Sequence, residues 1–184
     1  METRALVRIA LFAALIAVLG LLPAFQLAFA GGVPITAQTL GVMLAGIVLG
    51  ARQGALAVLL LILVVALGAP LLAGGRGGLG VFFAPSVGFL IGWVPGAFVT
   101  GLVMQRLSRL PVFPAALLAA IVGGIVVIYA SGILGLMAVA RLAPLQALIA
   151  VTAFIPGDLL KAIAAALLAE AAGRTYPAAL GRAR

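Results

Sequence analysis

The sequence predicts an all-α integral membrane protein, a bundle of six transmembrane helices that forms a single domain over residues 1–184. The first observation is composition: 66% of the residues are hydrophobic and 8% are charged, against about 25% charged residues in a soluble domain. The second is length, because a membrane-crossing helix takes roughly 20 residues and 184 residues leave no room for a separate soluble domain. The third is arginine, which separates the apolar runs.

Composition also excludes several classes of function. The chain has no cysteine, no histidine and three acidic residues, so we expect no disulfide, no thiol nucleophile, no metal site and no cofactor. A net charge of +8 would suggest nucleic acid in a soluble protein. Here the arginines lie between apolar runs rather than in a patch with aromatics, so we expect contacts to membrane lipid and no nucleic-acid binding.

The first span is predicted over Ala5–Phe25. Arg4 and Arg8 stand at its start and Ala28-Phe29-Ala30 follows it, a combination that also resembles a cleavable signal peptide. We favour a retained helix, because the run is long enough to cross a bilayer and the rest of the chain is itself a membrane bundle.

Proline and glycine clusters divide the next part of the chain. Gly31–Gln38 is an uncharged loop or re-entrant segment, and a short span follows over Thr39–Gly50. Ala51-Arg52-Gln53 interrupts this helix, and a third span is predicted over Gln53–Gly68. A long glycine-rich loop, Ala69–Pro85, leads to the fourth.

The fourth span is predicted over Ser86–Met104 and the fifth over Val112 to about Val139. Proline suits the first turn of a helix better than its interior, so we expect the sixth span to run from Pro156 to Ala172. Residues 144–155 then form a short outer segment.

The arginines give these spans an orientation. With the amino terminus in the cytoplasm, eight arginines fall on the inner side and only Arg76 and Arg141 on the outer side. Cytoplasmic loops carry an excess of basic residues, so we expect both termini to be cytoplasmic in a multi-pass protein of the cell (inner) membrane. The inner arginines are Arg4, Arg8, Arg52, Arg106, Arg109, Arg174, Arg182 and Arg184.

Small residues recur at four-residue spacing, and helices in lipid associate through close backbone approach. On the fourth span we expect a packing face made of Gly88, Gly92, Gly96 and Thr100. On the first span we expect an alanine face that docks a separate protein. Its candidates are Ala10 with Ala14 and Ala13 with Ala17.

Asp158 and Lys161 are the charged residues inside an apolar stretch, apart from those near termini or loops. A charge at the centre of a lipid-exposed helix costs about 2.5–3.5 kcal/mol on insertion scales, and a spacing of three puts both on one helix face. We expect that face to point into the bundle, with Asp158 in the first turn, where the helix dipole favours an anion. The pair either fixes helix register or forms the polar centre of a ligand site, and intramembrane charge favours the site.

Two weaker signals accompany this pair. Thr36, Gln38 and Tyr129 are polar side chains near the outer ends of helices, where they line a cavity or serve as interfacial or loop residues. The segment Gly74–Gly80 lacks the Gly-Lys-Ser/Thr ending of a phosphate-binding loop, so we reject nucleotide binding. No set of nucleophile, base and orienting residue is visible, so we expect no catalytic residues and no enzymatic activity.

Four segments together resemble the BioY family, the substrate-capturing components of energy-coupling-factor (ECF) biotin transporters. The resemblance runs through nearly the whole chain in order, and P-I-T-x-Q-T and G-D-L-L-K are its specific motifs. The segments are Pro34–Leu60 (PITAQTLGVMLAGIVLGARQGALAVLL), Gly74–Trp93 (GGRGGLGVFFAPSVGFLIGW), Val127–Leu136 (VIYASGILGL) and Ile155–Ala162 (IPGDLLKA).

The resemblance implies a six-helix bundle that binds biotin near the outer surface, as the substrate-specific subunit for high-affinity uptake. It implies that Asp158 contacts the ureido N–H groups and that Lys161 contacts either the ureido carbonyl or the valerate carboxylate. It also implies a membrane scaffold subunit, docked on the alanine face, and two cytoplasmic ATPases. Residues in matching segments that are implied to contact biotin are Thr36, Gln38, Gly75, Gly78 and Tyr129.

The sequence departs from the family pattern at some pocket positions. The usual tyrosine near Leu61 is absent, Leu71-Leu72 replaces an aromatic before the glycine loop, and Phe89 stands where the G-P-T-G-G-Y pattern has tyrosine. Two other roles stay open: an S component for a different vitamin, and a self-sufficient secondary transporter, which would be expected to show inverted repeats that we do not see.

Overall fold

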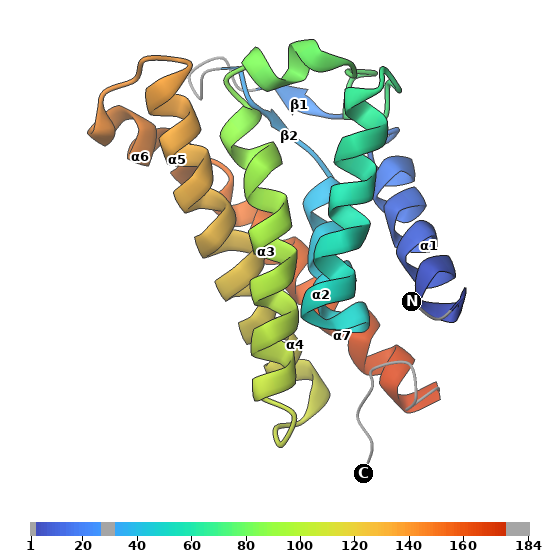
Figure 1. Ribbon diagram of the computed structural model, residues 1–184. Coiled ribbons are helices and arrows are strands. Elements are labelled where there is room, and N and C mark those ends of the chain that lie inside the picture. Colours follow the sequence, from blue (N-terminus) through green and yellow to red (C-terminus); the bar gives the residue numbers. More distant parts are fainter. Residues whose placement is uncertain (1–2, 27–31, 176–184) are drawn as a thin grey trace.

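The computed structural model is a helical bundle and describes residues 3–26 and 32–175 (Figure 1). The Ala28-Phe29-Ala30 motif and the arginines Arg182 and Arg184 lie outside the described residues. Along the chain the elements are α1 (Thr3–Leu19), β1 (Phe25–Gln26), β2 (Pro34–Ile35), α2 (Gln38–Ala66), the 3-10 helix η2 (Leu79–Phe83), α3 (Val87–Arg106), α4 (Val112–Ala119), the π-helix η3 (Ala120–Val127), α5 (Ile128–Ala138), α6 (Pro144–Thr152) and α7 (Ile155–Thr175).

Helix α2 is two helical arms that meet at Gly50. This residue has φ 78° and ψ 178°, a conformation that is essentially restricted to glycine. Beyond it the chain folds back, so that Gly54 of the second arm packs on the backbone of Ala45 and Gly46 in the first. The predicted break between two helices is therefore present, but it lies at Gly50 and the helix resumes at once at Ala51.

The predicted packing face of α3 is confirmed. Gly88 lies against the backbone of Gly135 in α5, and Gly96 and Thr100 lie against Gly123 in η3. No side chain separates the helices at these positions, so their backbones come close enough for extensive dispersion contacts. The π-helical turns of η3 within the predicted fifth span were not expected from the sequence.

Residues 3–26 and 32–175 contain three helices long and apolar enough to cross a membrane: α2, α3 and the continuous run Val112–Ala138. The pair α6 and α7, bent by 51°, passes the same test as one broken span. Large apolar side chains such as Leu11, Leu59, Leu134 and Leu160 are exposed around the bundle. A surface of this kind suits lipid rather than water.

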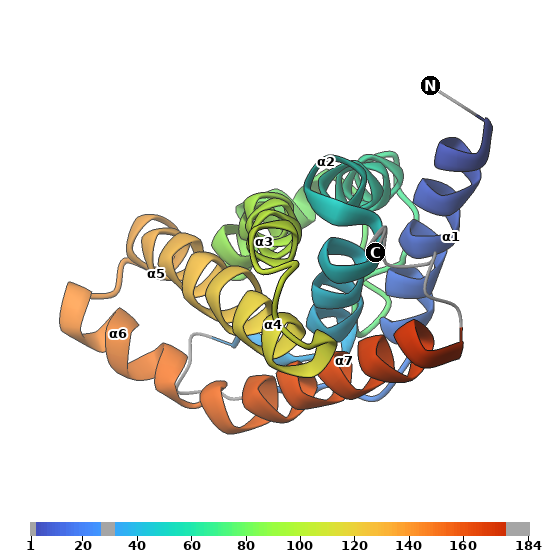
Figure 2. The ribbon, with the colours of Figure 1, turned by 90° about the horizontal axis from the view of Figure 1, so that it is seen from below.

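The ends of the bundle differ in character. Viewed from below in Figure 2, α1 packs on α2 at one edge, while α7 runs alongside α4 and α2. The loop between α3 and α4 lies at the lower end in Figure 1. The Gly50 turn lies beside the end of α3 that leads into this loop, where a Cβ on Gly50 would meet Gln105. The short β1–β2 ribbon, η2 and the loop between α2 and α3 close the upper end, which we term the cavity end.

We predict that Gly88→Ala destabilises the fold by about 1–3 kcal/mol, because the added methyl group overpacks the α3–α5 contact. The new Cβ would clash with the Ser131 carbonyl oxygen and would lie 2.7 Å from the Gly135 Cα. Thermal unfolding in detergent measures the loss. Gly80→Ala is the control, since the space around Gly80 is open, and an equal loss in both variants would contradict the packing argument.

Candidate functional site

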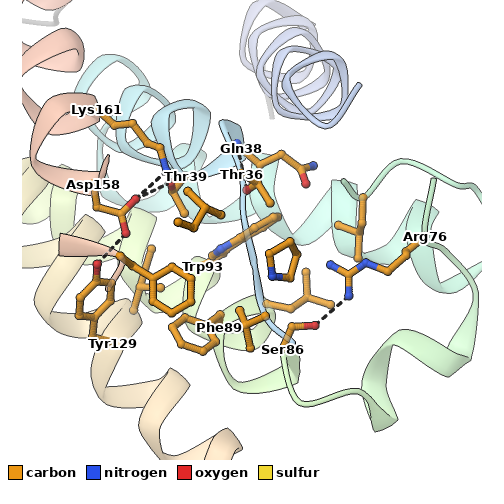
Figure 3. A pocket seen from close by; sticks show the side chains of 17 residues that line it. Thr36, Gln38, Thr39, Arg76, Ser86, Phe89, Trp93, Tyr129, Asp158 and Lys161 are labelled. Carbon is orange, nitrogen blue, oxygen red and sulfur yellow. Dashed lines mark hydrogen bonds and ion pairs between the residues drawn. The ribbon is translucent and has the colours of Figure 1, made fainter. Parts of the chain in front are cut away.

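A cavity lies at the cavity end, between β2 and the adjoining ends of α2, α3, α5 and α7 (Figure 3). Including its open mouth, it holds about 580 Å³ free of protein atoms. Most of the wall is apolar, and the polar groups come from separate elements. The lining residues are Val33, Pro34, Ile35, Thr36, Gln38, Thr39, Leu72, Arg76, Ser86, Phe89, Leu90, Trp93, Ile128, Tyr129, Phe154, Asp158 and Lys161.

The carboxylate of Asp158 is the centre of a hydrogen-bond network at one side of this cavity. Its Oδ1 accepts from Lys161 Nζ at 2.7 Å and from Thr39 Oγ1 at 3.1 Å, and its Oδ2 accepts from Tyr129 Oη at 2.8 Å. Lys161 Nζ also donates to Thr39 Oγ1 at 3.1 Å. The donors come from α2, α5 and α7, so the network ties three helices to one buried charge.

Helix ends stabilise this charge further. Helix α7 begins at Ile155, with Pro156 and Asp158 in its first turn, so the predicted helix start and position of Asp158 are confirmed. Thr39 lies in the first turn of α2. Two positive helix ends therefore face the carboxylate. The side chains of Asp158 and Lys161 are 7% and 17% exposed, which confirms that their face points into the bundle.

Gln38 ties the neighbouring elements together. Its Nε2 donates to the carbonyl oxygens of Ile16 and Leu71, and its Oε1 accepts from the Ala73 backbone N–H. Both amide hydrogens are thus used by the protein, and the side chain is 1% exposed. Gln38 lines the cavity and also holds α1 and the loop after α2 in place.

Arg76 comes from that loop and reaches the opposite side of the cavity. Its Nε donates to the Ala73 carbonyl oxygen at 3.1 Å, and its Nη1 donates to Ser86 Oγ at 3.0 Å. Burial lowers the pKa of the Arg76 guanidinium from its ordinary value, but arginine stays protonated in proteins. The cavity therefore contains a second cation, which the sequence reading had assigned only to an outer loop.

Aromatic rings form the wall between these polar sides. Phe89, Tyr129 and Phe154 contact one another with ring centroids 5.7–6.5 Å apart, and Trp93 of α3 also lines the cavity. Together with the polar network, this wall suits a compact ligand with an apolar body and both donors and acceptors.

The structure brings together five of the seven expected binding residues, Thr36, Gln38, Tyr129, Asp158 and Lys161. Gly75 and Gly78 are not among the lining residues; they flank Arg76 in the loop with φ of 71° and 74°. The sequence reading missed Thr39, Arg76, Ser86, Trp93 and Phe154 as lining residues. Thr39 adjoins Gln38 in the P-I-T-x-Q-T motif, which was a signal available from the sequence.

Positions that depart from the family pattern also have clear places. Leu72 and Phe89 line the cavity, whereas Leu61 is buried in the core at 2% exposure. Leu71 contributes its carbonyl oxygen to Gln38. Leu72 is therefore the aliphatic side chain that stands at the wall where the family pattern has an aromatic one, while Phe89 keeps a ring without the hydroxyl.

The two alanine pairs of α1 lie in different surroundings. Ala13 is buried and Ala17 is partly buried against the core shared with α2. Ala10 and Ala14 are exposed on the other side of α1.

Comparison with known proteins gives a consistent result. Residues 1–178 match the BioY family. The chain is 56% identical to the biotin transporter BioY of Rhizobium etli, covering 96% of this chain and 97% of that one. It is 55% identical to the biotin transporter BioY of Rhodobacter capsulatus, covering 94% of each. Its structure is similar to the crystal structure of the S-component for biotin from an ECF-type ABC transporter, with a TM-score of 0.88, 29% identity and 95% of each chain covered.

We predict that Thr39→Val destabilises the protein by about 1–3 kcal/mol, because it removes a donor to the buried carboxylate and an acceptor for the buried ammonium. Thr39→Ser keeps the hydroxyl and should stay near wild type. The thermal midpoint in detergent measures both. Equal midpoints for the two variants would show that the hydroxyl contributes nothing to the network.

Proposed function

Because this chain belongs to the BioY family, we propose that it binds biotin with high affinity and serves biotin uptake as the substrate-specific subunit of an ECF-type transporter. The observation that carries the proposal is the buried Asp158 network beside an aromatic wall in an open cavity. A transport role of this kind requires recognition and release of the ligand and no covalent chemistry.

The ureido ring of biotin has two N–H donors and one carbonyl acceptor. Asp158 has a free lone-pair position on Oδ2 beside the bond from Tyr129, so it accepts a ureido N–H. Lys161 uses two of its three N–H groups on Asp158 and Thr39 and donates the third to the ligand. The sulfur-containing ring packs against Phe89, Trp93 and Tyr129.

The remaining expected residues act around this centre. Thr36 lines the cavity next to Gln38, and its hydroxyl accepts a hydrogen bond from the Gln38 backbone N–H. Gly75 and Gly78 shape the loop that carries Arg76, because their positive φ values suit glycine. These residues contribute to binding through the wall and the loop of the cavity.

The topology that we propose has six spans, with α2 counted as two, and with both termini on the cytoplasmic side of the cell membrane. Support comes from the Gly50 reversal and from the arginines near it: Arg52 follows the reversal, Arg106 ends α3 and Arg109 lies in the loop between α3 and α4. That loop lies at the end opposite the cavity in Figure 1. The cavity end, with Arg76 and Arg141, then faces outward.

Transport against a gradient needs an energy source, and we found no nucleotide-binding motif in the sequence of this chain. We propose a transmembrane scaffold subunit and two cytoplasmic ATPases as partners. Ala10 and Ala14 are the residues for scaffold docking, because they are exposed small residues that allow close helix approach. Ala13 and Ala17 lie on the buried side of α1 and pack it against the bundle.

We predict that purified protein in detergent binds biotin at micromolar or lower concentration, and that Asp158→Asn and Lys161→Ala each weaken binding at least tenfold. Each variant leaves a buried hydrogen-bonded partner unpaired. Calorimetry measures the affinity. Trp93 gives a second signal, because it lines the cavity and is the single tryptophan of the chain.

The matched control is Glu170→Gln on the same helix, which breaks the exposed pair with Arg174 and should leave binding unchanged. Absence of biotin binding by the wild type would refute the proposed ligand. Wild-type affinity in both site variants would show that the ion pair is structural only.

We predict that Ala10→Trp with Ala14→Trp abolishes co-purification with the scaffold subunit and leaves biotin binding intact, since large side chains prevent close helix approach. The control is Leu134→Trp on the lipid-exposed face of α5, far from α1 in Figure 2. Retained co-purification in the double variant would place the docking surface elsewhere.

A further inference from the structure

The ionisable groups that line the cavity do not balance in charge. Asp158 is neutralised by Lys161 at 2.7 Å, whereas Arg76 donates only to a neutral carbonyl and a neutral hydroxyl. Among the described residues the one other acid is Glu170, which pairs with Arg174. The lining therefore carries one uncompensated positive charge, and it lies on Arg76.

Arg76 has the donors to hold an anion. Its guanidinium carries five N–H groups, and Ala73 and Ser86 account for two of them. The three others remain for a carboxylate, which arginine contacts through two parallel N–H groups. Figure 3 shows the guanidinium reaching from its loop toward the cavity interior.

The start of α3 reinforces this end of the cavity. Ser86 is the N-cap residue of α3, and its side chain makes no capping hydrogen bond to the helix. Its hydroxyl instead accepts from Arg76. The positive end of a 20-residue helix therefore lies beside the guanidinium, where both favour a negative group.

Arg76 and Asp158 lie on opposite sides of the cavity. In Figure 3 the side chains of Phe89 and Trp93 are seen between them, and all four residues line the same cavity. A ligand with a polar ring at one end and a carboxylate at the other meets complementary groups at both ends.

We propose that Arg76 is the receptor for the ligand's carboxylate and fixes its orientation in the cavity, a proposal that rests on biotin being the ligand. The valerate carboxylate binds Arg76, and the ureido ring binds at Asp158. Lys161 then donates to the ureido carbonyl, because its charge is already engaged by Asp158. Arg76 is thus a specificity residue that selects the free acid over neutral derivatives of the same ring.

The test compares biotin with its neutral primary amide by calorimetry on the full chain in detergent. The wild type should prefer biotin by about ten- to hundredfold, the range expected for hydrogen bonds between charged groups. Arg76→Gln should bind the amide as the wild type does and lose the preference for biotin. Arg76→Lys should retain part of the preference, since it keeps the charge without the planar fork.

Arg141→Gln is the charge-matched control, because Arg141 is an exposed arginine outside the cavity lining, and it should keep the full preference. Equal weakening of biotin and amide in Arg76→Gln would mean that Arg76 only supports the loop, and would overturn the proposal. An undiminished preference in Arg76→Gln would overturn it too and assign the carboxylate to Lys161. A wild type that binds neither compound would instead refute the biotin function itself.

Discussion

A carboxylate buried in a membrane bundle must be neutralised and hydrogen-bonded, and this constraint shapes the protein. Asp158 meets it with Thr39, Tyr129 and Lys161, which belong to three helices. An isolated ion in a low-dielectric interior would be strongly destabilising, so the meeting of three helices at this point stabilises the folded bundle. The same arrangement leaves donors and acceptors at the cavity wall, so that the groups that stabilise the bundle are also the groups that we propose recognise the ligand.

Close packing elsewhere makes room for this cavity. Gly88 and Gly96 bring α3 against the α5 side of the bundle, and the resulting rigid wall presents Phe89 and Trp93 to the interior. At the cavity end, Gln38 holds the loop after α2 through two hydrogen bonds, to Leu71 and Ala73, and a third ties it to Ile16 of α1. That loop places Arg76. The close packing of α3 on α5 and η3 and the loop held by Gln38 thus position the two polar sides of the cavity.

Local signals predicted a large share of this structure. Pro156 marks the start of α7 because proline suits a first helical turn, and the four-residue spacing of glycines on α3 marks its packing face. Other features depend on partners distant in sequence. Thr39 binds Asp158 across 119 residues and Gln38 binds Ala73 across 35, and neither separation leaves a local pattern. The π-helical turns of η3 follow from how the helix packs rather than from composition. The distribution of arginines predicts on which side of the membrane Arg76 lies. It does not predict that the Arg76 side chain lines the cavity.

The reversal at Gly50 has a consequence for how the chain enters the membrane. The first arm of α2, residues 38–49, rises about 18 Å at 1.5 Å per residue, whereas the hydrocarbon core of a bilayer is about 30 Å thick. A helix this short is a poor membrane anchor by itself. The two arms are joined at Gly50 with no loop between them. During synthesis the first arm is therefore expected to enter the lipid only once the second arm has been made, so that the two arms insert together as a helical hairpin.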